Sequence, residues 1–563
     1  MKKSFPVIFF LFLSLAGGYT AGCSSKNTDG AKEKSAAEIL PESTEFMLRL
    51  PSAEKICSLF SVTENSIMGR PVKKIAELKE KWGFHPLLPD ELRKRGFDTA
   101  REISISADNF QWPGHGGDPL MDLLLLLPVT DGKKALDAVQ YYLKNENPET
   151  VFTSEDGLLC FQSPGKAFRG AMIEKKGHLL IAFNEQSEVK DFIRSVLQSG
   201  SSLKNAGHYR DIVSRMDAGK NFFLYADFGK IIRNNYETLK MLSEKKSGNS
   251  PGFAANLEYL KDYEGCGITL DAEQSDLHVK GLLQVREGSD FLKISENARF
   301  NKKTVLGIPK NAAVLISTAV DFAEYYRIIK SAMSAAEKSA WENRLADFRG
   351  TYGTDAEKEI FPNIEGNLNM GIYDGRSISM SNYNLLVTLS LKNGEKMQEV
   401  LEKMYQSLTP EQQIMIRKDK IDETDAYVMT FLGIIQVYAG VKDENLILAL
   451  GYPIFDMALR GDIAGGFLSE TKDKELVRHL QGDKGIFYAN IPEIYRAANN
   501  FSFLMQQFNM QQGGKDKSGE AVRDIEYLLI STHTEKNSFG MDLICKTAFS
   551  SPFFQGIRKV VEE

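Results

Sequence analysis

Apolar residues follow two different periods along the chain, and the change of period predicts the elements. Leu123–Leu127 is an unbroken apolar run, which is typical of a strand buried on both faces. Asp131-Gly132 then predicts a tight turn, because glycine tolerates positive φ and aspartate can bond its own backbone. Beyond it, apolar residues recur at i, i+3, i+4 and i+7, which predicts an amphipathic helix packed on the sheet: Ala135, Ala138, Val139 and Tyr142.

The same strand, turn and helix recur in the second half of the chain. Leu389–Leu401 reads LSLKNGEKMQEVL, with Asn393-Gly394 at the predicted turn. Its helix face is Met397, Val400, Leu401 and Met404. Four more blocks recur in the same order: Leu40–Leu50 as Ile308–Thr318, Gly177–Phe183 as Glu444–Leu450, Tyr225–Arg233 as Tyr488–Arg496, and Ile268–Val279 as Ile530–Met541.

An ordered set of repeated blocks indicates a tandem duplication. We therefore predict an α+β fold of two tandem homologous domains, residues 40–290 and 300–555. Each domain is expected to be a mostly antiparallel or mixed sheet with amphipathic helices on one face.

The N-terminus resembles a bacterial lipoprotein signal peptide. Lys2 and Lys3 precede the apolar stretch Phe5–Ala16, and small residues lead into Cys23. The resemblance implies that residues 1–22 are a signal peptide and that Cys23 is lipidated. The polar residues 23–39 are expected to be a flexible tether. A plain secretory peptide cleaved nearby is the alternative interpretation.

The lipoprotein interpretation implies a place in the bacterial cell envelope. Ser24 after the cysteine favours sorting to the outer membrane, so we expect the chain on its periplasmic face. The membrane partner would then be reached through the lipid anchor alone, because no apolar run is long enough to span a bilayer. The formal net charge of −6 argues against a nucleic-acid partner, which requires a basic surface.

Motifs that carry chemistry are scarce. The chain contains no P-loop, nucleophile elbow or zinc-binding HExxH helix. Ser52 and Lys55 fit an SxxK pattern, but without a downstream KTG we expect Ser52 to be a helix N-cap. Gly114–Pro119 is rich in glycine and is interpreted as a loop.

The cysteines and histidines do not have the spacing of a metal site, so we predict neither a metal nor a cofactor. Each remaining cysteine aligns with an apolar residue of the other repeat and is expected to be a core residue. A disulfide such as Cys57–Cys160 remains an alternative interpretation if the chain lies in an oxidising compartment. The four are Cys57, Cys160, Cys266 and Cys545.

One further segment resembles a known family. Gly83–Asp108 reads GFHPLLPDELRKRGFDTAREISISAD, and Leu40-Pro41 and Ile308-Pro309 each open a strand. These segments resemble tandem-domain bacterial lipoproteins related to the family called domain of unknown function 3352. The family has no assigned activity, so the resemblance implies no catalytic residues.

Three hypotheses about function remain. The first is a non-catalytic lipoprotein that binds or scaffolds an unknown protein partner, the second is a carrier or sensor of an apolar ligand such as a lipid, and the third is an enzyme. We predict that the chain is not an enzyme, and that no pocket gathers three polar groups with strongly shifted pKa values. Such a cluster around His85, His115 or His178 would favour the enzyme.

Overall fold

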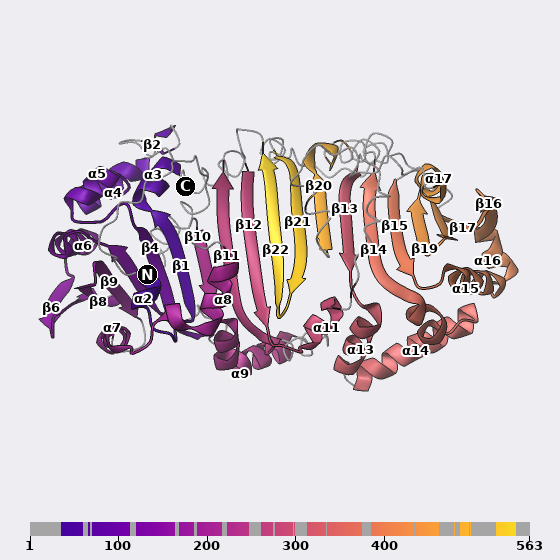
Figure 1. Ribbon diagram of the computed structural model, residues 1–563, viewed down its shortest axis with the longest axis horizontal. Coiled ribbons are helices and arrows are strands. Elements are labelled where there is room, and N and C mark those ends of the chain that lie inside the picture. The colour runs from indigo at the N-terminus through magenta and orange to yellow at the C-terminus, as the bar shows by residue number, and fades with distance from the viewer. Residues whose placement is uncertain are drawn as a thin grey trace. The chain divides into compact units, whose positions relative to one another are not determined.

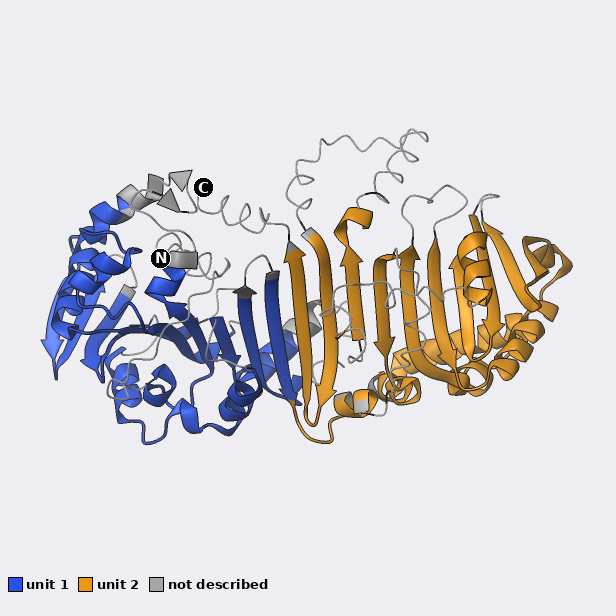
Figure 2. Cartoon of the chain, turned by 45° about the horizontal axis from the view of Figure 1, so that its top comes forward, with its two compact units in different colours: residues 1–246, 257–284, 549–563 blue, residues 247–256, 285–548 orange. Residues whose placement is uncertain are grey.

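The fold is described from a computed structural model of the chain, which divides into two compact units (Figure 2). Unit 1 comprises residues 1–246, 257–284 and 549–563, and unit 2 comprises residues 247–256 and 285–548. The structure describes residues 35–547 except 60–65, 68–69, 72, 113–119, 164–167, 185–188, 217–221, 247–259, 274–275, 297, 299–311, 334, 374–383, 432–434, 461–477, 479–484, 495 and 497–524.

Unit 1 is built on an antiparallel sheet whose strand order is β11-β10-β1-β4-β5-β9-β8-β7-β6 (Figure 1). These strands are β1 (Phe46–Ser52), β4 (Glu102–Gln111), β5 (Leu120–Pro128), β6 (Val151–Glu155), β7 (Leu158–Ser163), β8 (Phe168–Lys175), β9 (His178–Asn184), β10 (Phe222–Ala226) and β11 (Tyr263–Glu273). A short hairpin, β2 (Ser66–Ile67) with β3 (Arg70–Pro71), is separate, and β12 (Asp276–Val285) follows β11. The helices are α2 (Ala36–Ile39), α3 (Ala53–Leu59), α4 (Lys73–Trp82), α5 (Pro89–Lys94), α6 (Gly132–Glu146), α7 (Val189–Gln198), η1 (Leu203–Asn205), α8 (Gly207–Arg215) and α9 (Phe228–Lys246).

Unit 2 has the corresponding antiparallel order β22-β21-β20-β13-β14-β15-β19-β18-β17-β16. The strands are β13 (Ala312–Ala319), β14 (Ile364–Tyr373), β15 (Leu385–Leu391), β16 (Ile416–Ile421), β17 (Thr424–Phe431), β18 (Ile435–Lys442), β19 (Asn445–Leu450), β20 (Gly485–Asn490), β21 (Ile525–Glu535) and β22 (Ser538–Thr547). Its helices are α11 (Asp290–Glu296), α13 (Phe322–Ala332), α14 (Ala335–Tyr352), η2 (Ala356–Ile360), η3 (Phe361–Asn363), α15 (Gly394–Gln406), α16 (Pro410–Met415) and α17 (Tyr452–Arg460).

The α+β class predicted from the sequence is confirmed, and the two units share the order and register of their strands. Leu124 of β5 pairs with Ala182 of β9, and Leu386 of β15 pairs with Ala449 of β19 in the same way. The predicted strand and helix of the repeated stretch form β5 and α6 in unit 1 and β15 and α15 in unit 2.

The predicted turn between strand and helix is instead a helix start. Oδ1 of Asp131 accepts the backbone N–H of Lys134 at 3.1 Å, so Asp131 caps α6. Asn393 caps α15 in the same way, through Lys396 at 2.9 Å. Gly394 is required by space rather than by positive φ, because a Cβ atom there would lie 1.8 Å from the carbonyl oxygen of Asp443.

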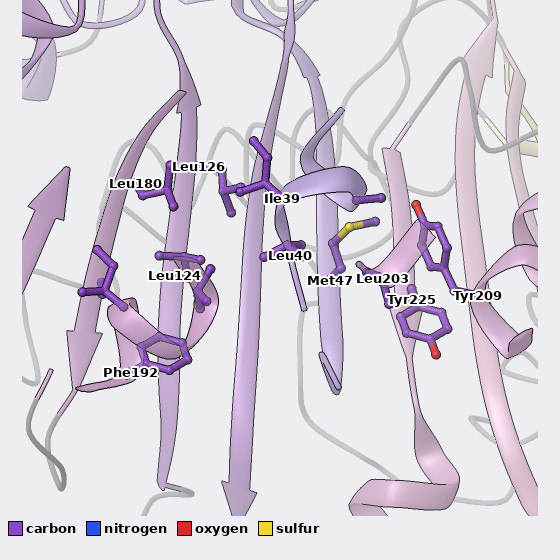
Figure 3. Close-up of a cluster of buried hydrophobic side chains, with 14 of the residues drawn as sticks. Ile39, Leu40, Met47, Leu124, Leu126, Leu180, Phe192, Leu203, Tyr209 and Tyr225 are labelled. Atoms are coloured by element: carbon purple, nitrogen blue, oxygen red, sulfur yellow. The ribbon is translucent and has the colours of Figure 1, made fainter. Parts of the chain in front are cut away.

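Helices cover both faces of the sheet in unit 1, whereas the sequence analysis placed them on one face. Leu124 and Leu126 point into a cluster with α2 and α7, which we call face 1 (Figure 3). Leu125 and Leu127 point to the other side, face 2, where they pack with α6, α4 and the segments around α3 and α5. Neighbouring residues of a strand point to opposite faces, so an unbroken apolar run needs cover on both.

The folded unit also begins earlier than predicted. Residues 36–39, which were expected to belong to the tether, form the helix α2. Ala37 and Ile39 are buried in the face 1 cluster together with Leu40. Only the preceding part of the predicted tether, together with the predicted signal peptide, lies outside the described residues.

Candidate functional site

Three carboxyl groups are buried together in unit 1, which the sequence analysis did not predict. Glu45 precedes β1, Asp108 lies on β4, and Asp122 lies opposite Asp108 on β5. All three residues are less than a tenth exposed. Burial raises the pKa of Asp108 to about 7 and also raises the pKa of Asp122, because a buried carboxylate loses its hydration.

Hydrogen bonds and a cation satisfy the Glu45 carboxylate within the fold. Nζ of Lys230 lies 3.3 Å from its Oε1, and Nδ2 of Asn234 donates to the same oxygen at 2.9 Å. The backbone N–H of Phe110 donates to Oε2 at 2.8 Å. Both Lys230 and Asn234 belong to α9, so the carboxylate fastens this helix to the ends of β1 and β4.

The cluster belongs to unit 1 alone, since Ala313 and Tyr373 occupy the positions in unit 2 that match Glu45 and Asp108. Asp122 is held by Nδ2 of Asn109 at 2.6 Å. Within the described residues, no group of three or more His, Cys, Asp or Glu side chains is arranged to hold a metal ion. The pKa is raised at Asp108 and Asp122 only, so the prediction that no pocket gathers three polar groups with strongly shifted pKa values is not contradicted, and the contacts of the cluster indicate a structural role.

The histidines named in the sequence analysis serve separate parts of unit 1. Nδ1 of His85 accepts the backbone N–H of Leu87 at 3.2 Å. Nε2 of His178 lies 3.1 Å from Nη2 of Arg101. Burial, followed by the charge of Arg101, lowers the pKa of His178 to about 4, so its ring is neutral near pH 7. His115 lies outside the described residues, as does the loop Gly114–Pro119.

Ser52 and Cys160 have the structural roles that the sequence predicts, whereas Cys57, Cys266 and Cys545 are half-buried. Oγ of Ser52 accepts the backbone N–H of Lys55 at 3.2 Å and so caps α3. Cys160 lies in the face 1 cluster, whereas Cys57 packs against the apolar cluster of face 2. The sheet therefore separates these two thiols. Burial raises the pKa of Cys266 to about 11, which keeps its thiol protonated near pH 7.

The main difference between the units lies on face 2 of the sheet. Leu368 and Met370 of β14, with Leu448 of β19, are 38%, 37% and 37% exposed. The residues at the matching strand positions of unit 1 are Ile103, Ile105 and Ile181. They are 8%, 9% and 3% exposed. We call the region around Leu368, Met370 and Leu448 the open face.

The cover in unit 1 comes from the chain between β1 and β4. Ile56 of α3 packs on Ile103 and Ile105, together with Leu87 and Leu88. Phe84, Trp82 of α4 and Leu92 of α5 join α6 in the cluster that buries Ile181.

The corresponding stretch of unit 2 forms α13 and α14, and it leaves the open face partly uncovered. None of the described residues of α14 is buried, and α13 leaves Tyr325 and Ile329 exposed. Around the open face, the neighbouring face 2 residues are half-buried and aliphatic, including Val314, Ile316 and Val387. Contiguous exposed apolar surface is a common feature of ligand, protein and membrane contact sites.

These features define a duplicated α+β protein in which one copy presents an apolar sheet face. The family model described as Protein of unknown function (DUF3352) matches residues 113–538. The chain belongs to this family, as the resemblance of Gly83–Asp108 suggested, although that segment precedes the matched residues.

The other comparisons add little. No curated protein matches the chain. The structure of crystal form IV of TP0453 is similar with a TM-score of 0.24 and 9% identity, over 44% of this chain and 79% of that chain. Crystal form III of TP0453 gives a TM-score of 0.23 and 10% identity, over 49% of this chain and 90% of that chain. These scores are too low to carry an argument.

No apolar run of the sequence is long enough to predict a membrane-spanning segment. None of the helices within the described residues combines the length and the apolar character that crossing a bilayer requires. The lipidation site, Cys23, lies outside these residues.

Proposed function

We propose that the chain is a lipid-anchored lipoprotein of the cell envelope, on the periplasmic face of the outer membrane, and that it acts as a non-catalytic binding module. Its ligand is an apolar molecule such as a lipid, held on the open face of unit 2. The observation that carries this proposal is the exposure of Leu448, 37%, where the matching Ile181 is 3% exposed.

The chemistry of the open face favours an acyl chain over a protein partner. The residues around it are aliphatic, including Leu368, Met370 and Val387. Protein interfaces are enriched in aromatic residues and arginine, whereas an acyl chain needs only apolar contact. Full burial of a completely exposed Leu or Met side chain contributes about 1.5–3 kcal/mol to the free energy of binding. The side chains of the open face are only partly exposed, so each contributes proportionally less.

Anchoring supports the same proposal. An acylated Cys23 would hold the chain at a membrane surface, where lipids are abundant. The buried carboxyl groups of unit 1 are satisfied by their own fold, so they support a structural rather than a catalytic role.

A neutral apolar probe tests the open face. N-phenyl-1-naphthylamine fluoresces when it enters an apolar site, and the wild-type chain is expected to bind it. Leu448→Glu and Met370→Glu should each weaken that binding about ten-fold or more, because a charge on the face must be desolvated. Ile414→Glu is the matched control, since Ile414 is 83% exposed on α16, away from the open face.

Equal loss of binding in Ile414→Glu, or full binding in Leu448→Glu, would contradict the proposal. Solvent extraction of the protein purified from its own envelope, followed by mass spectrometry, then identifies the bound lipid.

A further inference from the structure

A shallow, open hollow of about 530 Å³, which we call the cavity, is lined by α13 and α14 of unit 2. Three of its lining residues are cationic, and none of them is acidic. The full lining consists of Ala323, Tyr326, Arg327, Lys330, Ser331 and Lys338. The surface of the cavity is mostly apolar, and the hydroxyl groups of Ser331 and Tyr326 already donate to the carbonyl oxygen of Ile328 and to Glu357.

Ion pairs outside the lining hold two of these cations in place. Nη2 of Arg327 lies 2.6 Å from Oε1 of Glu324 and 3.4 Å from Oδ1 of Asp290. Nζ of Lys330 lies 2.5 Å from Oε1 of Glu357.

The same Glu357 oxygen also accepts the hydroxyl of Tyr326, and the indole N–H of Trp341 donates to Tyr326 at 2.9 Å. The walls of the cavity are thus fixed by hydrogen bonds between α13, α14 and η2.

Lys338 is the cation whose charge is not compensated. Within the described residues Lys338 forms no ion pair, whereas Arg327 and Lys330 do. Its side chain is half-buried in the first part of α14. An anion entering the cavity would meet the charge of Lys338, whereas Glu324, Asp290 and Glu357 balance the charges of Arg327 and Lys330.

The helix α13, which lines the cavity, begins near one end of the open face. Thr318 of β13 pairs with Leu368 of the open face, and α13 begins four residues later at Phe322. Phe322 packs on Phe361 of η3 with ring centroids 5.7 Å apart, and η3 leads directly into β14. The helix that lines the cavity is therefore joined near its start to the strands that carry the open face.

We propose that this cavity binds the anionic head group of the ligand whose apolar part lies on the open face. This inference rests on the proposed function and narrows it to one class of ligand, the anionic amphiphiles. A carboxylate and a phosphate monoester share the required chemistry, because each accepts several charge-assisted hydrogen bonds.

The test compares three twelve-carbon probes on the full mature chain by displacement of N-phenyl-1-naphthylamine. The wild type is expected to bind dodecanoate and dodecyl phosphate more tightly than dodecanol. Lys338→Gln should weaken binding of the two anions about three-fold to ten-fold and leave dodecanol unchanged, as removal of one charge-assisted contact predicts. Lys420→Gln, at an exposed lysine on β16, is the matched control.

The outcomes separate the two proposals. A loss confined to the anions in Lys338→Gln supports the head-group site, and the tighter of the two anions identifies the group. If dodecanol still binds and Leu448→Glu abolishes that binding, while Lys338→Gln has no effect on the anions, the head-group inference is overturned and the proposed function stands. If none of the three probes binds the wild type, both are overturned.

Discussion

The backbone N–H of Glu45 donates a hydrogen bond of 3.0 Å to Oδ1 of Asp108, across the paired strands β1 and β4. Asp108 is buried, and the pKa of its carboxyl group is raised from 3.8 to about 7. Between these two values the folded chain retains a proton that the unfolded chain releases. The contribution of Asp108 to stability is therefore fully present below about pH 4 and is lost as the pH rises through 7.

Asp108→Asn should remove this pH dependence, because the amide oxygen still accepts the hydrogen bond from Glu45 but carries no charge. Between pH 4 and pH 8 the wild type should lose up to about 4 kcal/mol of unfolding free energy relative to the variant. Urea denaturation followed by circular dichroism measures this difference. Asp137→Asn, at an exposed position on α6, should leave the pH dependence as in the wild type; an unchanged slope in Asp108→Asn would contradict the assignment.

Ile181 and Leu448 offer a matched pair for testing the difference between the units. Ile181→Ala removes a fully packed side chain and should cost about 2–5 kcal/mol of unfolding free energy. Leu448→Ala removes a partly exposed one and should cost about 1 kcal/mol or less. Thermal or urea unfolding of the two variants gives the comparison. Equal costs would show that Leu448 is covered in solution.

Gly394 tests the close approach of helix α15 to the hairpin between β18 and β19. Gly394→Ala would place a methyl group against the carbonyl oxygen of Asp443, so α15 must shift, at about 1–3 kcal/mol of stability. Gly207→Ala is the control, because α8 begins at Gly207 and open space surrounds its Cβ position. That substitution is expected to be neutral or slightly stabilising. Similar unfolding midpoints for the two variants would rule out the close contact.

Replacing Cys23 tests the proposed anchor. Cys23→Ala lacks the thiol that receives the acyl chains and should move from the membrane fraction to the soluble fraction of the envelope. Fractionation with immunoblotting measures the distribution, and Cys57→Ala controls for the loss of a cysteine. A variant at Cys23 that still sediments with the membrane would reject the lipoprotein proposal.

The repeated elements could be predicted because their signals are local. The run Leu123–Leu127 and the helix face from Ala135 to Tyr142 lie within a few residues of one another, and each period specifies one type of element. Because neighbouring residues of a strand point to opposite faces, the same run implies that helices pack on both faces of the sheet. The prediction of helices on one face did not take this into account.

The candidate site could not be predicted in this way. The strand around Leu368 and Met370 alternates with buried Asn367 and Asn369, a pattern that does not show which face is covered. Exposure depends on how α13 and α14, which precede β14, pack against the sheet, and the sequence of β14 carries no signal of that packing. Likewise Glu45 and Asp108 are 63 residues apart and meet only through strand pairing.

The cover over face 2 of unit 1 has a consequence for exchange. Because α3, α4 and α5 are part of the same chain, they compete with any free ligand at a very high effective concentration. A lipid could reach Ile103 and Ile105 only after local opening of these helices, which cover that surface in the folded chain. In unit 2 the matching surface is partly uncovered, so under the proposed function a ligand reaches it without any such opening.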